Sequence, residues 1–240
     1  MSNEEENLKA SSSSQIAPPL SLPSWVELPP DIMANILERL GVIEILESAQ
    51  RVCSTWWNVC HNPTMWRVVD LKSDPDNIKT PQVLEEICRV AVDRSQGQLL
   101  KLCIENFGNT DLLNYVAERC SQLKHLRLVR CNGNFAGGLA VAAKNFPLLE
   151  ELDINSTSIT KDDIEMVGLS CPLLKSLILD AGPFHMVESP SQDNDRALVI
   201  GKSMPELRHL TFRAHNLTYE GLQAIFEGCP HLESPDLGFY

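Results

Sequence analysis

Cysteine and histidine are the residue types in this chain whose side chains could ligate a metal ion or act as nucleophile and base. The 240 residues include eight cysteines and six histidines, and the two types come together at Cys60-His61 and at Cys229-Pro-His231. No C-x-x-C pair is present, and no second pair lies at zinc-ligand spacing. Catalysis by a cysteine–histidine pair would also need a third, orienting group and a pocket. The sequence therefore predicts no metal site, no cofactor and no enzyme activity.

A glycine cluster at residues 131–138, CNGNFAGG, lies between an expected strand and an expected helix, where a nucleotide-binding turn could stand. It lacks the G-x-G-x-x-G spacing that lets the backbone approach a pyrophosphate, and it has no P-loop lysine. Neighbouring segments of the chain also turn at the corresponding place. We interpret the cluster as a turn of the fold and not as a phosphate site.

Six segments of the chain fit the template L-x-x-L-x-L. Their middle positions are residues 102, 126, 152, 177, 210 and 235, so the successive spacings are 24, 26, 25, 33 and 25. This template with a period near 25 is the signature of the leucine-rich repeat. In L-x-L both apolar residues point to one side of a strand and the residue between them points to the other. The segments are residues 99–104, 123–128, 149–154, 174–180, 207–212 and 232–237.

Helical segments are expected between these strands, at residues 111–119, 137–144, 161–169, 195–202 and 219–227. Threonines precede three of them as candidate N-caps, at positions 110, 160 and 218. Alternating strands and helices favour parallel strands with the helices on one face. The predicted fold class is therefore α/β: an open horseshoe with helices on its convex side.

The return from each helix to the next strand carries a recurring apolar residue, at Cys120, Phe146, Cys171, Met204 and Cys229. Cysteine alternates there with phenylalanine and methionine, which indicates packing and free thiols. This pattern resembles the cysteine-containing class of leucine-rich repeats.

Two departures interrupt the regular pattern. About eight extra residues fall within 182–196, and insertions of this kind in solenoids often form binding loops. Pro235 replaces the middle leucine of the last segment, and proline suits a terminal edge strand because it cannot complete a ladder. We expect the last repeat to be incomplete and poorly ordered.

A small helical bundle is expected ahead of the repeats. Leu28-Pro29-Pro30-Asp31 suits the first turn of a helix, and Gly41 suits its end. A second apolar periodicity runs through residues 44–60, until Pro63 forbids further helix. A piece of under about 50 residues buries too little apolar surface to be stable alone. It therefore needs a partner, within the chain or outside it.

The order Leu28-Pro29, Ile32, Ile36-Leu37, Leu40, Val52-Cys53, Trp56-Trp57 and Trp66 resembles an F-box. The resemblance implies docking on the Skp-type adaptor of a Skp–cullin–F-box (SCF) ubiquitin ligase and, through it, contact with cullin and RING subunits. An F-box with cysteine-type repeats is similar to plant F-box proteins. The alternative is a non-catalytic scaffold whose helices only cap the solenoid. On the first interpretation, the adaptor-binding residues are Leu28, Pro29, Ile32, Ile36, Leu37, Leu40, Val52 and Trp56.

The residues that point outward from the repeat strands form the predicted concave surface. We expect this surface to bind a target protein, by analogy with other proteins of this fold. Of the four tryptophans, the sequence does not distinguish those of the core from those of a docking face. The candidate target-binding residues are His125, Arg127, Glu151, Asp153, Ile178, Asp180, His209, Thr211 and Arg213.

The charge of the chain and the composition of its segments limit its possible partners, its location and its division into domains. The formal net charge is −12 and the pI is about 4.9, so nucleic acid and anionic membranes are poor partners. The N-terminus is acidic and serine-rich, unlike a secretory signal, so we expect a nuclear or cytoplasmic protein. We divide the chain into a disordered tail (1–23), the F-box (24–71), a connector with a first helix (72–97) and the repeats (98–240).

Overall fold

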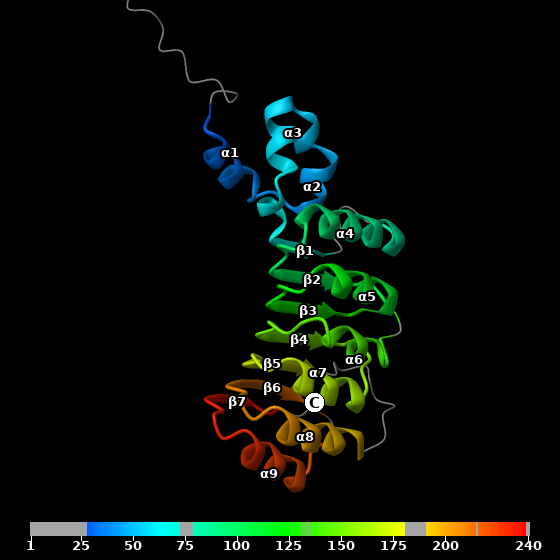
Figure 1. The fold of residues 1–240 in the computed structure, drawn as a ribbon. Coiled ribbons are helices and arrows are strands. Elements are labelled where there is room, and N and C mark those ends of the chain that lie inside the picture. Colours follow the sequence, from blue (N-terminus) through cyan, green and yellow to red (C-terminus); the bar gives the residue numbers. More distant parts are fainter. Residues whose placement is uncertain are drawn as a thin grey trace, which may run out of the picture.

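The computed structural model describes residues 28–72, 79–131, 133, 135–180, 191–214 and 216–238. The expected tail, most of the insertion within 182–196 and most of the turn-rich connector at 73–80 lie outside these residues. The described chain is an elongated stack (Figure 1). Short N-terminal helices lie at one end, and strands with accompanying helices follow in sequence order toward the other.

In the described residues, seven parallel strands form one sheet in the order β1 to β7. Each strand pairs with the next strand in the chain, as the repeat pattern predicted. The first strand, β1, was not predicted. The strands are β1 (Val68–Leu71), β2 (Lys101–Glu105), β3 (His125–Val129), β4 (Glu151–Asn155), β5 (Ser176–Asp180), β6 (His209–Arg213) and β7 (Ser234–Asp236).

Two buried apolar rows run across the sheet, because the register aligns the same repeat positions. Every member is at most 6% exposed. The first row joins Leu102, Leu126, Leu152, Leu177 and Leu210, and the second joins Ile104, Leu128, Ile154, Leu179 and Phe212. In β1, Val69 and Leu71 begin the same rows. The predicted inward orientation of both apolar residues in L-x-L is confirmed. The strand β1, which follows the helical module in the chain, pairs with β2 and so joins the module to the repeats.

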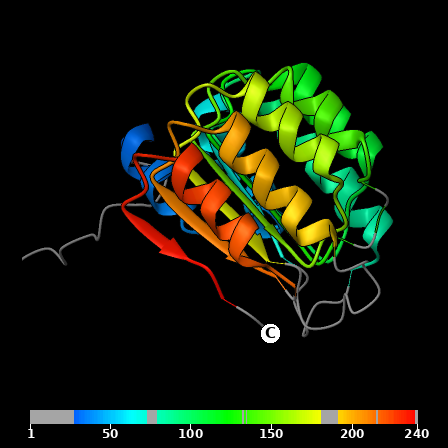
Figure 2. The same cartoon turned by 90° about the horizontal axis from the view of Figure 1, so that it is seen from below.

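Helices cover one face of this sheet, and neighbouring helices pack side by side (Figure 2). The five apolar residues at the helix-to-strand returns are all at most 4% exposed, which agrees with a packing role. Burial raises the pKa of Cys171 to about 12 and that of Cys229 to about 11, so these thiols stay protonated at neutral pH. The helices are α4 (Pro81–Ser95), α5 (Thr110–Arg119), α6 (Gly138–Ala143), α7 (Lys161–Ser170), α8 (Ser191–Ser203) and α9 (Tyr219–Gly228).

Capping side chains form hydrogen bonds within the first turn of their own helix and also with a neighbouring helix. Thr160 caps α7, as predicted, in a capping box with Asp163. The same buried Asp163 carboxylate accepts hydrogen bonds from the backbone N–H groups of Gly137 (3.0 Å) and Ala140 (2.8 Å), at the start of α6. The cap of α5 is Asn109 and not Thr110, and Thr218 makes no side-chain cap within α9.

The N-terminal module consists of α1 (Pro30–Leu37), α2 (Val42–Glu47), the 3-10 turn η2 (Ala49–Arg51), α3 (Ser54–Cys60) and the 3-10 turn η3 (Pro63–Trp66). The expected small bundle of two or three short helices is therefore present, and the apolar periodicity over 44–60 is interrupted at Cys53, whose backbone is extended. Trp66 is 1% exposed, and its Nε1 donates a hydrogen bond to the carbonyl oxygen of Cys60 at 2.9 Å. The guanidinium of Arg94 on α4 lies 5.3 Å from the Trp66 ring centre, which ties the module to the first repeat helix.

Replacing Asp163 by alanine removes the α7 cap and the acceptor for two α6 N–H groups. We expect the free energy of unfolding to fall by about 2–3 kcal/mol, because the helix cap is lost and partly buried hydrogen bonds to the Asp163 side chain disappear. Urea unfolding of purified protein measures this. Asp162→Ala, at the exposed neighbouring position in the same helical turn, is the control. An equal loss in both variants would contradict the assigned role of Asp163.

Candidate protein-binding surfaces

The N-terminal module leaves apolar side chains uncovered by its own chain. Ile32 on α1 is 43% exposed, and Val52, just before α3, is 61% exposed. Pro29 is also exposed. Large apolar groups left exposed on a small module indicate a surface that another molecule covers. Ile36 is partly buried, and three further predicted residues are partly buried against the core: Leu28, Leu40 and Trp56.

Leu37 is a correction to the predicted adaptor-binding set. Its side chain is 0% exposed and belongs to the core together with Met33, four residues earlier on the same face of α1. A side chain with no accessible surface contributes to stability and not to docking. The apolar spacing along α1 predicted the helix, but α1 carries apolar residues on either side of its buried face as well as on that face. Periodicity therefore could not show which residues turn inward.

Trp57 is a surface residue that the predicted set did not include. Its side chain is 49% exposed, and its ring stacks on His61 with 3.8 Å between the ring centres. The Nδ1 atom of His61 also lies 2.8 Å from the Trp57 carbonyl oxygen. This stacking holds an aromatic face toward solvent, which suits an interface anchor. The adjacent pair Trp56-Trp57 was the available signal, because neighbours on a helix point about 100° apart.

A groove of about 1160 Å³ separates α1 from α3 and from the first strand. Apolar side chains line part of it, including Ala34, Leu40, Val59 and Val68. Val68 belongs to the outward face of β1, so the groove leads from the helical module onto the sheet. Of the predicted adaptor-binding residues, Leu40 lines this groove.

The outward-facing residues of the sheet form rows across the strands. The first row is Lys101, His125, Glu151, Ser176, His209 and Ser234; the second is Cys103, Arg127, Asp153, Ile178, Thr211 and Asp236; the third is Glu105, Val129, Asn155, Asp180 and Arg213. The strand register thus brings all nine predicted target-binding residues onto one face. Asp180 is nevertheless only 9% exposed, so it would contribute to binding of a target mainly through the side chains next to it.

Polar and charged side chains on this face pair laterally between neighbouring strands. Arg127 lies 2.9 Å from Asp153, and His125 lies 2.9 Å from Glu151. Arg213 bridges strands on both sides, at 3.6 Å from Asp180 and 3.1 Å from Asp236. Such pairs fix long side chains in one geometry although each exposed pair stabilises little. The face is therefore an ordered, mixed-charge surface.

Asp153 is the electrostatically distinctive residue at the centre of this surface. Its Oδ1 atom is buried and has no hydrogen-bond partner among the described residues. Burial raises the pKa of the Asp153 carboxyl, although the neighbouring Arg127 guanidinium acts in the opposite direction. Beside it in the same row, Ile178 presents a half-buried apolar side chain.

A small cavity of about 30 Å³ lies beside β4, β5 and β6. Ile159, Ile164 and Phe212 supply apolar lining, and Asp180 and Arg213 supply charge. The volume holds about one water molecule. Within the described ranges, no three His, Cys, Asp or Glu side chains are grouped to hold a metal ion, and no helix has the length and apolar character to cross a membrane.

Parallel strands at a period near 25, of which β1 to β6 are each followed by a helix, define a leucine-rich-repeat solenoid with a helical N-terminal module. Two sequence families match this division. The F-box-like family matches residues 25–72, and the family described as "FBD-associated F-box protein At5g56370, LRR repeats" matches residues 94–194.

Three relatives from Arabidopsis thaliana extend the comparison. Putative F-box/LRR-repeat protein 23 is 44% identical over 95% of this chain and 52% of its own length. Putative F-box/LRR-repeat protein 9 is 43% identical over 88% of this chain and 85% of its own, and F-box protein SKIP19 is 43% identical over 89% and 68%. The chain thus spans about half the length of the first of these relatives. It belongs to the F-box/leucine-rich-repeat protein family.

Asp153 should give stability an unusual pH dependence. Because its pKa is raised in the folded state, its contribution is fully present below the unfolded value of 3.8 and is lost as pH rises through the folded pKa. Wild-type stability should therefore fall relative to Asp153→Asn as pH increases over this window. Urea unfolding of both proteins at closely spaced pH values measures the difference. A difference that stays constant, or grows with the opposite sign, would contradict the burial of this carboxylate.

Proposed function

We propose that this chain is the substrate-receptor subunit of an SCF ubiquitin ligase. The observation that carries the proposal is the uncovered apolar surface of the N-terminal module. Ile32 and Val52 match positions of the F-box pattern and are exposed, although the module has a repeat core beside it against which they could have packed. A Skp-type adaptor would cover them and would link the chain to cullin and RING subunits.

The role proposed for the chain is positional. No acid–base or nucleophilic chemistry is assigned to it, since in this class of ligase the reacting ubiquitin thioester belongs to another subunit. Holding a target beside that thioester raises the effective concentration of target lysines. Degradation of the target would follow from ubiquitin transfer. We place this activity in the nucleus or cytoplasm, which imaging of a fluorescent fusion protein would test.

The concave surface is the proposed target site. Its side chains come from adjacent strands in fixed register, and lateral ion pairs hold them in place. Preorganised side chains lose little conformational freedom when a partner binds, so the surface suits protein recognition.

A scaffold whose helices only cap the solenoid is the second candidate function. The observation in its favour is that Met65 and Trp66 pack in the common core, where they close its first end. Capping and adaptor docking use different sides of the module. Capping alone leaves the exposure of Ile32, Val52 and Trp57 without a role.

Adaptor binding should be lost when the exposed apolar surface becomes charged. We expect Ile32→Asp to weaken binding to a purified Skp-type adaptor by on the order of 30-fold or more, as for a buried interface anchor. Calorimetry with the full chain measures this. Val141→Asp is the matched control, because Val141 is 53% exposed on α6, far along the stack.

The double variant Leu28→Ala with Pro29→Ala tests the start of the module in the same way. If the helices serve only as a cap, the wild-type chain itself should bind no adaptor. The two substitutions should then alter only the stability of the protein. Equal affinity of wild type and Ile32→Asp would also overturn the proposed docking surface.

Target recognition should depend on the central ion pairs of the sheet. We expect the double substitution Arg127→Glu with Glu151→Lys to remove target proteins from the proximity-labelling profile of the full chain under proteasome inhibition, because like-charge contacts repel a matched partner. Lys144→Glu, on the helical face, is the control. Retention of the adaptor in all profiles shows that the variants remain folded, and an unchanged target profile would contradict the assignment.

A further inference from the structure

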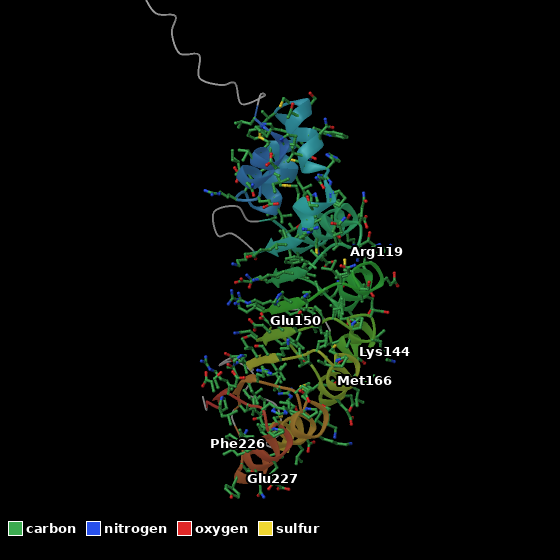
Figure 3. The ribbon with its side chains drawn as sticks, turned by 60° about the vertical axis from the view of Figure 1, so that its left-hand side comes forward. Arg119, Lys144, Glu150, Met166, Phe226 and Glu227 are labelled. Atoms are coloured by element: carbon green, nitrogen blue, oxygen red, sulfur yellow. The ribbon has the colours of Figure 1, made fainter. Side chains whose placement is uncertain are left out.

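Three exposed leucines lie where two central repeats pass from helix to strand. Leu169, near the end of α7, is 67% exposed, Leu173 is 43% exposed, and Leu148 in the preceding repeat is 38% exposed. We call Leu148, Leu169 and Leu173 the leucine edge. Figure 3 shows this middle part of the stack, with Lys144 on the helix side and Glu150 toward the sheet.

The repeat architecture does not require leucine at these three positions. Leu148 and Leu173 come two residues after the apolar residue of their helix-to-strand return, and the other three returns have polar residues there: Gln122, Glu206 and His231. Leu169 comes two residues before the apolar residue of its return, and the other four returns have charged residues there: Glu118, Lys144, Lys202 and Glu227. Repeats of the same chain thus fold with polar side chains at these places, so the leucines are not needed for the shared core.

The register of β4 and β5 brings Leu148 and Leu173 side by side. Glu151 pairs with Ser176, and each leucine comes three residues before its own member of this pair. The carbonyl oxygen of Glu150 accepts hydrogen bonds from two backbone N–H groups of the next repeat, so the chains run together before the strands begin. Neighbouring strands lie about 4.8 Å apart, which places the two leucines on one surface.

Stacking of repeats leaves the leucine edge uncovered. Repeats are added along the strand order, and the neighbours of β4 and β5 on both sides, β3 and β6, are already in place. A further repeat would extend the sheet beyond β7 and would not reach the leucine edge, which runs along the side of the stack. A molecule that covers these leucines must therefore lie across the returns.

The return segments around the leucine edge are basic, although the chain as a whole is acidic. These segments are residues 118–124, 144–150, 169–175 and 202–208. Six basic residues against three acidic ones give them a net charge of +3, whereas the whole chain carries −12. The basic residues are Arg119, Lys124, Lys144, Lys175, Lys202 and Arg208, and the acidic ones are Glu118, Glu150 and Glu206.

Ion pairs to nearby carboxylates offset part of this charge. Lys124 lies 2.8 Å and Lys175 4.0 Å from Glu150, and Lys202 lies 3.3 Å from Glu165. The lysine side chains of these pairs are 43–76% exposed, so a partner's carboxylates can still approach them. An apolar surface with a basic border complements apolar side chains that have Asp or Glu beside them. Two copies of the leucine edge would instead bring lysines together.

We propose that the leucine edge binds an amphipathic helix of another protein, with aspartate or glutamate beside its apolar side chains. The proposal does not depend on the adaptor or target surfaces, because the leucine edge belongs neither to the N-terminal module nor to the outward face of the strands. The chain would then hold a further protein while both of those surfaces stay accessible.

Two synthetic peptides of roughly 18 residues, long enough to form helix, test the proposal. Both carry leucine at helical spacing, and one has glutamate borders while the other has lysine borders. Calorimetry with the full chain should show tighter binding of the glutamate peptide. This is a stringent test, since the net charge of −12 would by itself attract the lysine peptide.

The double variant Leu148→Gln with Leu173→Gln should weaken binding of the glutamate peptide on the order of 10-fold. It gives both returns the residue that Gln122 already supplies in another repeat, so the fold should be kept, which thermal unfolding checks. Val90→Gln is the matched control, because Val90 is 39% exposed on α4, and it should leave the affinity unchanged.

Charge reversal gives a second readout. Lys202→Glu should weaken binding of the glutamate peptide and strengthen binding of the lysine peptide, and both changes should shrink as salt rises. Equal binding of the two peptides, no binding of the glutamate peptide up to roughly 1 mM, or equal affinity of wild type and the double leucine variant would overturn the proposal.

Two other occupants of the leucine edge are outcomes of the same experiments. Sedimentation with vesicles of anionic lipid that depends on Leu148 and Leu173 would identify a membrane surface as the occupant. A dimer in light scattering that the double leucine variant converts to monomer would identify a second copy of the chain. Either result would overturn the proposal.

Discussion

Stacking of apolar side chains between neighbouring strands is the constraint on which this structure depends. No single strand and helix can bury its own apolar side, so each repeat needs the next. The aligned leucines and their partners two residues later satisfy this need along the sheet. Buried apolar residues from Met33 to Cys229 belong to one cluster. The N-terminal module therefore shares its core with the repeats.

This shared core matters for the proposed function. β1 continues the buried rows into the module, and Trp66 packs beneath Arg94 of α4. The surface proposed for the adaptor and the face proposed for the target are thus fixed relative to each other. Fixed geometry would suit the proposed receptor role, in which the chain would contribute to ubiquitin transfer by positioning the target.

The sequence predicted the parts of the fold that repeat. The L-x-L spacing predicted the strands and their inward residues, and the alternation of elements predicted parallel pairing. It missed β1 because Trp66 and Val69 stand where the L-x-x-L-x-L template has leucine, so only Leu71 matches it. It predicted short helices in the N-terminal module but did not locate the interruption at Cys53, since apolar periodicity continues across it. Leu37 was misassigned because an apolar stripe does not show which of its neighbours the rest of the chain covers.

The contacts between individual side chains were harder to predict from the sequence. The outward positions could be counted, but the pairing of Arg127 with Asp153 depends on strand register and on rotamers set by neighbours. The exposure of Trp57 and its stacking on His61 depend on how α3 packs.

Hydrogen–deuterium exchange of the full chain, with and without a purified Skp-type adaptor, tests the central claim most directly. The claim is that the module keeps an apolar surface for a second polypeptide while its opposite side belongs to the repeat core. Adaptor should slow exchange in α1 and α3 and leave the strands β3 to β6 unchanged. Unchanged exchange in α1 and α3 at saturating adaptor, or protection confined to the repeats, would contradict it.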